Sequence, residues 1–168
     1  MVNTFIPYSD FAKCAKVLDN KRLGKQRVEA KQILNILLGD TTTKGWRNHP
    51  VVKMWVGYEN ALITYYNAIV TEWIKRGYRN TMLIMKPSGR ITMPWFIGNK
   101  SVHLSHQANL LRKDYTYYSK YFKHVPKEYI KYTYIWSSKL TPEQKKYLII
   151  NKNKIVDIKL VSTISNYL

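Results

Sequence analysis

The sequence predicts an all-α protein, a compact single-domain helical bundle around one long central helix. The chain has 168 residues, of which 45% are hydrophobic, enough to bury one core. Apolar residues recur at spacings of three and four in several segments, which is the period of an amphipathic helix. Capping residues, prolines and glycines stand at the ends of these segments. We therefore expect one domain over residues 1–168.

A polar residue marks the start of the first helix. Ser9 or Asp10 can cap a short helix over residues 11–18, because a side-chain oxygen there can accept from the amide groups of the first turn. The apolar positions that recur along this helix are Phe11, Ala15 and Leu18.

The second helix has a signal at each end. Asp19 or Asn20 can cap it, and it is predicted to run to Leu38 and stop at Gly39, since glycine suits the left-handed residue after a helix. The positions predicted to face the core are Leu23, Ala30, Leu34 and Leu37.

Pro50 is well placed as the first residue of a long helix that ends near Gly77. A broad apolar side makes this the expected central helix of the domain. Its buried positions are Val51, Met54, Trp55, Leu62, Tyr65, Tyr66, Ile69 and Trp73.

Irregular chain and helices alternate in the remainder. Two prolines and two glycines in MKPSGRITMPWFIGNK, residues 85–100, predict a loop or short hairpin. Ser101 can cap a helix that reaches Lys113, and Thr141 opens another capped helix. The tail from Asn151 is rich in β-branched residues, which predicts a strand or a frayed helix.

Net charge is the strongest global feature, because 28 Lys and Arg against 10 Asp and Glu give +18. Such a surface attracts polyanions, so nucleic acid is the first candidate partner. An anionic membrane is the weaker alternative, since the cations are spread along the chain instead of forming one amphipathic anchor. No signal peptide or 18-residue apolar segment is found, so we expect a soluble, intracellular protein that does not bind membranes. We also expect a monomer.

The sequence contains few residues or motifs that could form a metal or cofactor site. Cys14 is the single cysteine, so an internal disulfide and a thiolate-rich zinc site are both excluded. His103 and His106 lie three residues apart, but no carboxylate lies nearby in sequence to complete a metal site. Phosphate-binding glycine loops and nucleophilic serine motifs are absent as well. We therefore expect no metal and no cofactor.

Glu29 is the only acidic residue between Asp19 and Asp40. One interpretation is an ordinary i, i+4 ion pair with Lys25, worth about 0.3 to 0.5 kcal/mol. The other is a proton carrier set into a phosphate-binding surface. Helical spacing places Glu29 off the apolar stripe, on a cationic polar face with Arg22, Lys25, Gln26 and Gln32.

A metal-free reaction on nucleic acid with one carboxylate also needs a nucleophile. An amine can attack the sugar C1′ of a damaged nucleotide, expel the base and form a Schiff base, while the carboxylate handles protons. The usual pKa of an α-amino group, about 7.7 to 8.0, leaves a neutral fraction near pH 7, whereas that of lysine, about 10.4, does not. The N-terminal amine is therefore favoured over a lysine.

Several phrases of the chain resemble the pyrimidine-dimer DNA glycosylase family, the phage endonuclease V-like enzymes. They are TFIPYSDF, LDNKRLGKQRVEAKQIL, GWRNHPVVKMWVGYENAL, EWIKRGY, SHQANLLRKD and a late YIW. The first phrase resembles the TFxPYxDF opening of the bacterial and viral members of that family. The resemblance covers about residues 4–136 and leaves 137–168 as a C-terminal extension.

The resemblance implies roles for individual residues. The catalytic glutamate of the family falls on Glu29, and a basic residue that contacts DNA falls on Arg22. The family's nucleophile is the α-amine exposed when the initiator methionine is removed, which implies Val2, or Met1 if that residue is retained. Gln32 is a further candidate DNA contact, and it stands where the endonuclease has an arginine.

Further candidate DNA contacts come from the cations and polar groups of three segments. On the second helix they are Lys21, Lys25 and Arg27. Arg47, Asn48 and His49 precede a helix N-terminus, which can bind phosphate. On the helix that ends at Lys113 they are His106, Asn109, Arg112 and Lys113.

The sequence thus predicts a DNA repair glycosylase and AP lyase that acts on damaged or abasic double-stranded DNA. The resemblance implies pyrimidine dimers as the lesion. The enzyme would extrude a nucleotide, cut its glycosidic bond through an imine and eliminate the strand 3′ to the abasic site. Two alternatives use the same scaffold: a non-catalytic DNA- or RNA-binding protein, and an RNA-directed enzyme or packaging factor.

Overall fold

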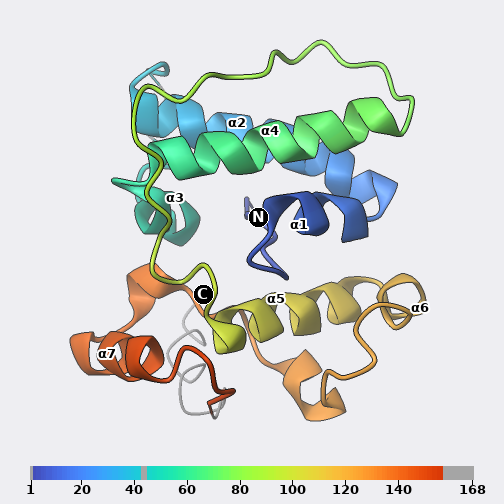
Figure 1. Cartoon of the computed structure of the whole chain (residues 1–168), viewed down its shortest axis with the longest axis vertical. Helices are drawn as coiled ribbons and strands as arrows, with labels where there is room; N and C mark the ends of the chain where they lie inside the picture. Colours follow the sequence, from blue (N-terminus) through green and yellow to red (C-terminus); the bar gives the residue numbers. More distant parts are fainter. Residues whose placement is uncertain (1, 43–44, 157–168) are drawn as a thin grey trace. The chain divides into compact units, whose positions relative to one another are not determined.

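The computed structural model describes residues 2–42 and 45–156, and within these ranges it contains helices and no strand (Figure 1). The all-α prediction is confirmed. The chain divides into two compact units: unit 1 is Met1–Phe5 with Asp10–Pro94, and unit 2 is Ile6–Ser9 with Trp95–Leu168. The α-helices are α1 Phe11–Val17, α2 Asn20–Leu38, α3 Pro50–Trp55, α4 Glu59–Lys75, α5 Lys100–Lys113, α6 Tyr115–Tyr118 and α7 Pro142–Ile150, and the 3₁₀ helices are η1 Lys127–Lys131 and η2 Ser137–Lys139.

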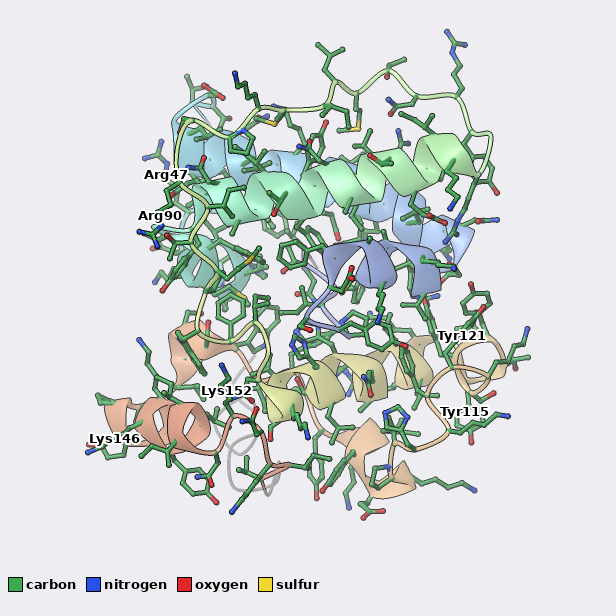
Figure 2. The ribbon with its side chains drawn as sticks, in the orientation of Figure 1. Arg47, Arg90, Tyr115, Tyr121, Lys146 and Lys152 are labelled. Carbon is green, nitrogen blue, oxygen red and sulfur yellow. The ribbon has the colours of Figure 1, made fainter. Side chains whose placement is uncertain are left out.

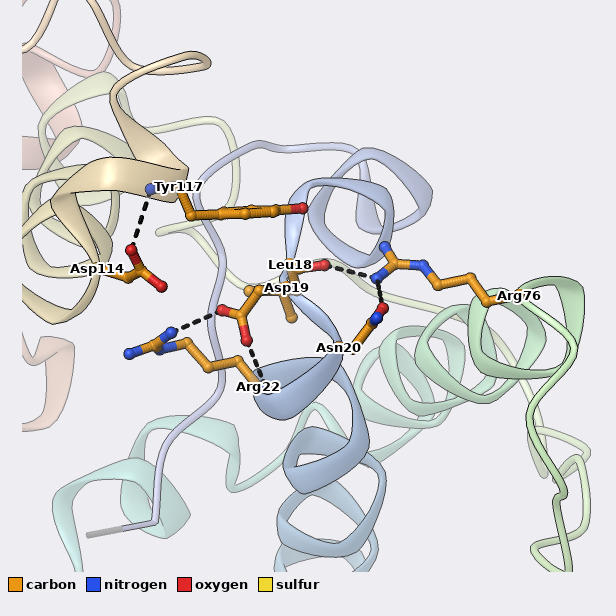
Figure 3. Close-up of polar contacts among 7 residues, drawn as sticks. All are labelled: Leu18, Asp19, Asn20, Arg22, Arg76, Asp114 and Tyr117. Atoms are coloured by element: carbon orange, nitrogen blue, oxygen red, sulfur yellow. Dashed lines mark hydrogen bonds and ion pairs between the residues drawn. The ribbon is translucent and has the colours of Figure 1, made fainter.

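The first two helices of unit 1 begin at predicted caps, and α2 also ends where predicted, at Leu38, whereas α1 ends at Val17, one residue before the predicted end. The Asp10 side chain accepts from the amide of Lys13 at 3.0 Å, and Asp19 accepts from the amide of Arg22 at 3.0 Å (Figure 3). Gly39 follows α2 with φ 79°, a left-handed conformation that costs glycine little.

α2 packs against α4 at Gly24. A Cβ at this position would lie 2.9 Å from Cζ3 of Trp73, so glycine lets the indole ring approach the helix. The predicted core positions Leu23, Ala30 and Leu34 are buried, and Leu37 is half-buried.

The prediction of one helix over residues 50–77 is wrong, because the segment forms two helices with a turn between them. Gly57 has φ 81°, and its amide donates to the carboxylate of Glu59 at 2.9 Å, so the chain changes direction. The apolar pattern nevertheless continues across the turn, because both helices contribute to the same core. Trp55 of α3 and Tyr65 of α4, for example, have ring centroids 6.4 Å apart.

The segment after α4 has no helix or strand of its own over residues 78–99, in agreement with the loop predicted for 85–100. Polar side chains of α4 hold its backbone. Asn67 exchanges two hydrogen bonds with the backbone of Met85, at 2.7 and 2.9 Å, and the Tyr66 hydroxyl donates to the carbonyl of Leu83 at 2.8 Å. The segment therefore runs back along α4 (Figure 1).

Unit 2 is built on α5, whose residues from Ser101 to Leu111 are all buried. The prediction that Ser101 caps this helix is wrong. Asn99 is the cap, and its side-chain oxygen accepts from the amides of Ser101 and Val102 at 3.2 Å each. The Ser101 hydroxyl instead accepts from the amide of Val156 at 2.9 Å.

The start of α7 has the predicted cap. Thr141 and Gln144 form a reciprocal pair, in which each side chain accepts from the other's amide, at 2.9 and 3.2 Å. Residues 151–156 form turns and irregular chain, and the rest of the tail predicted as a strand or frayed helix, residues 157–168, lies outside the described residues. In the described ranges, every helix is too short or too polar to span a bilayer.

Candidate active site

Glu29 lies on α2 but is buried, with only 5% of its surface exposed. The sequence predicts it on a cationic polar face. In the structure, backbone groups of Asn3 and Phe5 in the N-terminal segment, residues 2–5, bind Gln26 on this side of the helix. Oε2 of Glu29 accepts from Nε2 of Gln26 at 2.8 Å, and Oε1 lies 3.4 Å from Nζ of Lys25. The predicted ion pair forms, between an exposed ammonium group and a buried carboxylate.

Gln26 joins Glu29 to the N-terminal segment. Its Nε2 donates to the carbonyl oxygen of Asn3 at 2.8 Å as well as to Glu29, and its Oε1 accepts from the amide of Phe5 at 3.1 Å. The carbonyl oxygen of Asn3 and Oε2 of Glu29 are therefore no farther apart than twice the 2.8 Å bond that each makes to the same nitrogen. One buried amide thus fixes the backbone beside the carboxylate.

Side chains from α3 and α4 complete this arrangement. The Tyr65 hydroxyl lies 3.0 Å from the carbonyl oxygen of Phe5 and 2.5 Å from Oε1 of Gln26. Nε1 of Trp55 donates to the Thr4 hydroxyl at 3.1 Å. Three helices therefore hold the N-terminal segment, and Val2 at its start is 7% exposed.

The exposed cations of α2 share one edge with Glu29. Lys21 and Lys25 are exposed, as is Gln32, and these positions recur at helical spacing. Arg22 is more restricted, since its Nη1 pairs with Oδ2 of Asp19 at 2.7 Å and its side chain is 17% exposed (Figure 3). The structure thus brings most of the predicted phosphate contacts of α2 to the edge that borders the carboxylate.

Arg27 lies on another side of α2. Its Cζ is 4.1 Å from the centroid of the Trp73 ring, and its Nη1 donates to Oδ1 of Asn80 at 3.1 Å. Burial lowers the pKa of the Arg27 guanidinium, with Tyr66 acting in the opposite direction. Burial likewise raises the pKa of the Tyr66 hydroxyl, against the effect of Arg27. These contacts compete with the predicted role of Arg27 at DNA phosphates.

The loop before α3 keeps two of its predicted contacts on the surface. Arg47 and Asn48 are exposed. His49 has a structural role as the cap of α3, because its Nδ1 accepts from the amide of Val51 at 3.2 Å.

Two of the four candidate DNA contacts predicted on the helix that ends at Lys113 do not lie on the surface. His106 is 1% exposed and Asn109 is fully buried. Asn109 Nδ2 donates to the carbonyl oxygens of Ser105 at 2.8 Å and Tyr132 at 3.2 Å. Neither side chain is available to a phosphate on the surface. Two predicted contacts remain exposed, Arg112 and Lys113, although Nη2 of Arg112 also donates to Oδ1 of Asn109.

The two histidines of α5 bind the two backbone polar groups of one residue, Ile6. Nδ1 of His103 lies 2.7 Å from the carbonyl oxygen of Ile6, and the amide of Ile6 donates to Nδ1 of His106 at 3.4 Å. Burial lowers the pKa of His103, although its bond to Ile6 acts the other way. Burial, together with the neighbouring His103, lowers the pKa of His106 to about 3. Both rings are therefore neutral at pH 7 and hold the backbone.

Residues that ligate metals are scattered. Across 2–42 and 45–156, His, Cys, Asp and Glu side chains nowhere gather in groups of three or more that could hold an ion. A reaction without a metal stays a prediction.

Gln26 and Tyr65 are site residues that sequence reasoning misses. Gln26 is interpreted as part of a polar face and Tyr65 as part of the core. The spacing of three residues between Gln26 and Glu29 is a signal for their contact, but no local signal shows that the N-terminal segment lies against both.

Comparison with known proteins gives a match to a protein family. A family model described as pyrimidine dimer DNA glycosylase matches residues 2–86, which is half of the 168-residue chain. No curated protein and no solved structure matches the chain. The matched range contains Val2, Gln26, Glu29 and Tyr65, and it ends before the helices of unit 2.

Proposed function

The chain belongs to the pyrimidine dimer DNA glycosylase family, and from this premise we propose that it cuts the glycosidic bond of a damaged nucleotide with its own N-terminal amine. Membership makes it a DNA repair glycosylase with DNA as its substrate. The proposal adds the nucleophile, the residue that carries protons and a strand-cleaving AP lyase step.

The chemistry needs an amine and a proton carrier. The amine nitrogen bonds to C1′ while the bond from C1′ to the base breaks, and the base leaves with the electron pair and takes up a proton. Loss of the amine proton and opening of the sugar ring give a Schiff base. Removal of a C2′ proton then breaks the bond from C3′ to the phosphate oxygen and cleaves the strand. Glu29 is the proposed proton carrier, a role typically worth about 10²- to 10⁴-fold in rate.

The observation that carries the proposal is the amide shared by Asn3 and Glu29. Gln26 binds both at 2.8 Å, so the backbone one residue after Val2 is fixed beside the carboxylate. Removal of Met1, which lies outside the described residues, would make the Val2 nitrogen the terminal amine. If Met1 is retained, its own amine is the nucleophile.

The electrostatics also favour this role. Glu29 is 5% exposed and its neighbour Lys25 is exposed, so the carboxylate is largely shielded from water while a cation faces solvent beside it. Lys21 on the same edge adds a second positive charge for the phosphates that flank an extruded nucleotide.

Borohydride trapping on duplex DNA that contains one abasic site tests the proposal. The wild-type chain should give a covalent adduct, and peptide mapping should place the DNA on the N-terminal residue. Glu29→Gln should lose most of the adduct. Glu143→Gln, which removes an exposed carboxylate from the first turn of α7, is the matched control and should trap normally.

Three outcomes count against the proposal. An adduct on a lysine would replace the N-terminal amine as nucleophile, and normal trapping by Glu29→Gln would remove the role of the carboxylate. Salt-sensitive DNA binding by the wild type without any adduct would favour the non-catalytic binding protein. Intact mass of the same preparation shows which residue carries the amine.

A further inference from the structure

The tyrosine-rich stretch of unit 2 has no part in the proposed reaction. Residues 114–136 contain seven of the fourteen tyrosines and four lysines, against two acids. The family match ends at residue 86. Most of these tyrosines are not in the core, since only Tyr118 and Tyr134 of the seven are buried.

A pocket of about 210 Å³ opens within this stretch. Its floor is apolar, from Leu111, Phe122 and Val125, which are all buried. Its rim is polar and cationic, from Tyr115, Ser119, Lys123 and Lys127, with Ile130 completing the wall. Pockets that enclose a drug-sized ligand measure about 300 to 1,000 Å³, so this one suits a single flat ring system with an anionic group at the rim.

We propose that this pocket and the tyrosines beside it bind single-stranded DNA, with one unpaired base in the pocket and the adjoining phosphates on Lys123 and Lys127. This inference goes beyond the proposed glycosylase function, because it concerns another surface and does not use Glu29.

The exposed aromatic rings favour unpaired bases over a duplex. Tyr115, the first residue of α6, is 53% exposed, and Tyr121, which follows α6 in the chain, is 46% exposed (Figure 2). The rings of Tyr117 and Tyr121 lie 5.5 Å apart, and Nζ of Lys120 lies 5.5 Å from the centroid of the Tyr117 ring. Tyrosine faces beside cations stack on bases that have no neighbour, whereas stacked pairs cover base faces inside a duplex.

The local charge favours a polyanion. Lys123 and Lys127 are exposed, and neither has an ion pair among the described residues. Of the two acids in the stretch, Asp114 is engaged as the cap of α6, where it accepts from the amide of Tyr117 at 3.0 Å (Figure 3). Glu128 alone remains against the four lysines, so an anionic strand meets little repulsion.

Fluorescence anisotropy with a labelled oligo(dT) measures this binding in the full chain. Lys123→Ala with Lys127→Ala should weaken binding roughly tenfold at low salt and lower the salt slope by about 1.4, since each phosphate contact on a single strand contributes about 0.7. Tyr115→Ala should weaken it roughly fivefold or more, and Tyr115→Phe should retain it, because stacking needs the ring and not the hydroxyl.

The matched control is Lys146→Ala with Lys152→Ala, which removes the same charge from exposed positions of unit 2 outside the pocket lining (Figure 2). This variant should weaken binding less than about twofold. Equal losses in the two double variants would reduce the interaction to net charge and overturn the inference. An oligo(rU) that binds tenfold tighter than oligo(dT) would make RNA the partner and overturn the assignment to DNA.

A photo-crosslink tests the wild-type chain without depending on folded variants. Oligo(dT) with one 5-iodouracil should crosslink to a peptide that contains Tyr115 or residues 119–127, and crosslinks confined to other segments would reject the pocket. Borohydride trapping in parallel separates the two claims. A chain that crosslinks in the pocket but gives no borohydride adduct supports this inference and contradicts the proposed reaction. A chain that gives the adduct but no crosslink in the pocket supports the proposed reaction and contradicts this inference.

Discussion

Each unit of this protein has a helix whose buried polar side chains bind N-terminal backbone of the same unit, but the two helices do so with different chemistry. In unit 1, Gln26 of α2 holds residues 3–5 through the carbonyl oxygen of Asn3 and the amide of Phe5. In unit 2, His103 and His106 of α5 hold Ile6. Both sets satisfy buried backbone groups that would otherwise cost about 1–3 kcal/mol each.

The two groups of side chains differ in whether an ionisable group lies beside the bound backbone. Of the two histidines, His103 uses both ring nitrogens, because its Nε2 also accepts from the amide of Gly98 at 2.8 Å. On α2, by contrast, Gln26 is also bonded to Glu29, an ionisable group that is paired with an exposed lysine. Histidine is the commoner catalytic residue, yet in this protein the histidines are structural and the lone glutamate is the candidate for proton transfer.

The largest expected effect is a loss of activity on substitution of Glu29 on α2. Glu29→Gln should lower the single-turnover rate of strand cleavage at an abasic site by about 10²- to 10⁴-fold, because the proton carrier is lost. The free energy of unfolding should change by less than about 1 kcal/mol, since the shape is kept. A His103→Gln protein that unfolds at the wild-type temperature but does not cleave DNA would contradict the structural role of this histidine.

The second expected effect concerns the amide that links α2 to the N-terminal segment. Gln26→Leu should lower the free energy of unfolding by about 2–5 kcal/mol, because it leaves the amide of Phe5 and the carbonyl of Asn3 without this partner. Urea denaturation measures the loss. Gln32→Leu, an exposed site on the same helix, should change it by less than about 0.5 kcal/mol. Equal effects at the two positions would show that the shared amide has no special importance.

The third expected effect is a pH dependence that belongs to unit 2. The pKa of His106 is about 3 in the folded chain and about 6.5 when unfolded, so between these values the unfolded state takes up a proton that the folded state does not. The free energy of unfolding should therefore fall as pH drops below 6.5, by about 2 kcal/mol at pH 5 from this group.

Equilibrium unfolding at several pH values between 7 and 5 tests this dependence. His106→Gln should make the decline shallower than in the wild type. His124→Gln, at an exposed site, should alter it much less. An unchanged decline in His106→Gln would mean that the histidine does not remain neutral in the folded chain.

The smallest expected effect compares two cations of α2. Lys21→Ala should reduce the salt slope of duplex DNA binding by about 0.9 and leave stability within about 0.5 kcal/mol. Arg27→Ala should leave the slope nearly unchanged and destabilise the chain by about 1 kcal/mol, because it removes the contact with Trp73. The opposite pattern would assign Arg27 to the phosphates and Lys21 to the scaffold.

The fold is largely predictable because most of its boundaries are local. Asp19 and Gly39 define α2, and Thr141 with Gln144 starts α7, through bonds between residues close in sequence. The turn at Gly57 is missed because the apolar pattern of a buried helix continues on both sides of it. Pattern alone does not distinguish one long helix from two helices that share a core.

The site is only half predictable because its key contacts join distant segments. Periodicity within α2 places Glu29 off the apolar stripe, but it does not show that residues 2–5 cover that side. His106 and Asn109 are misplaced for a similar reason. Their polarity predicts an exposed face, whereas their partners are backbone groups of Ile6 and Tyr132, far away in the chain.

The division of the N-terminal backbone between the two helices also sets an order of assembly during synthesis. Phe5 and Asn3 are separated from Gln26 by 21 and 23 positions in the sequence, whereas Ile6 is separated from its two histidines by 97 and 100 positions. Contacts between near neighbours in sequence form sooner, and domains fold as they leave the ribosome. We expect the amide of Gln26 to hold the first residues of the chain before α5 has been made, so that proteolysis of arrested nascent chains should show residues 2–5 protected earlier than residues 6–9.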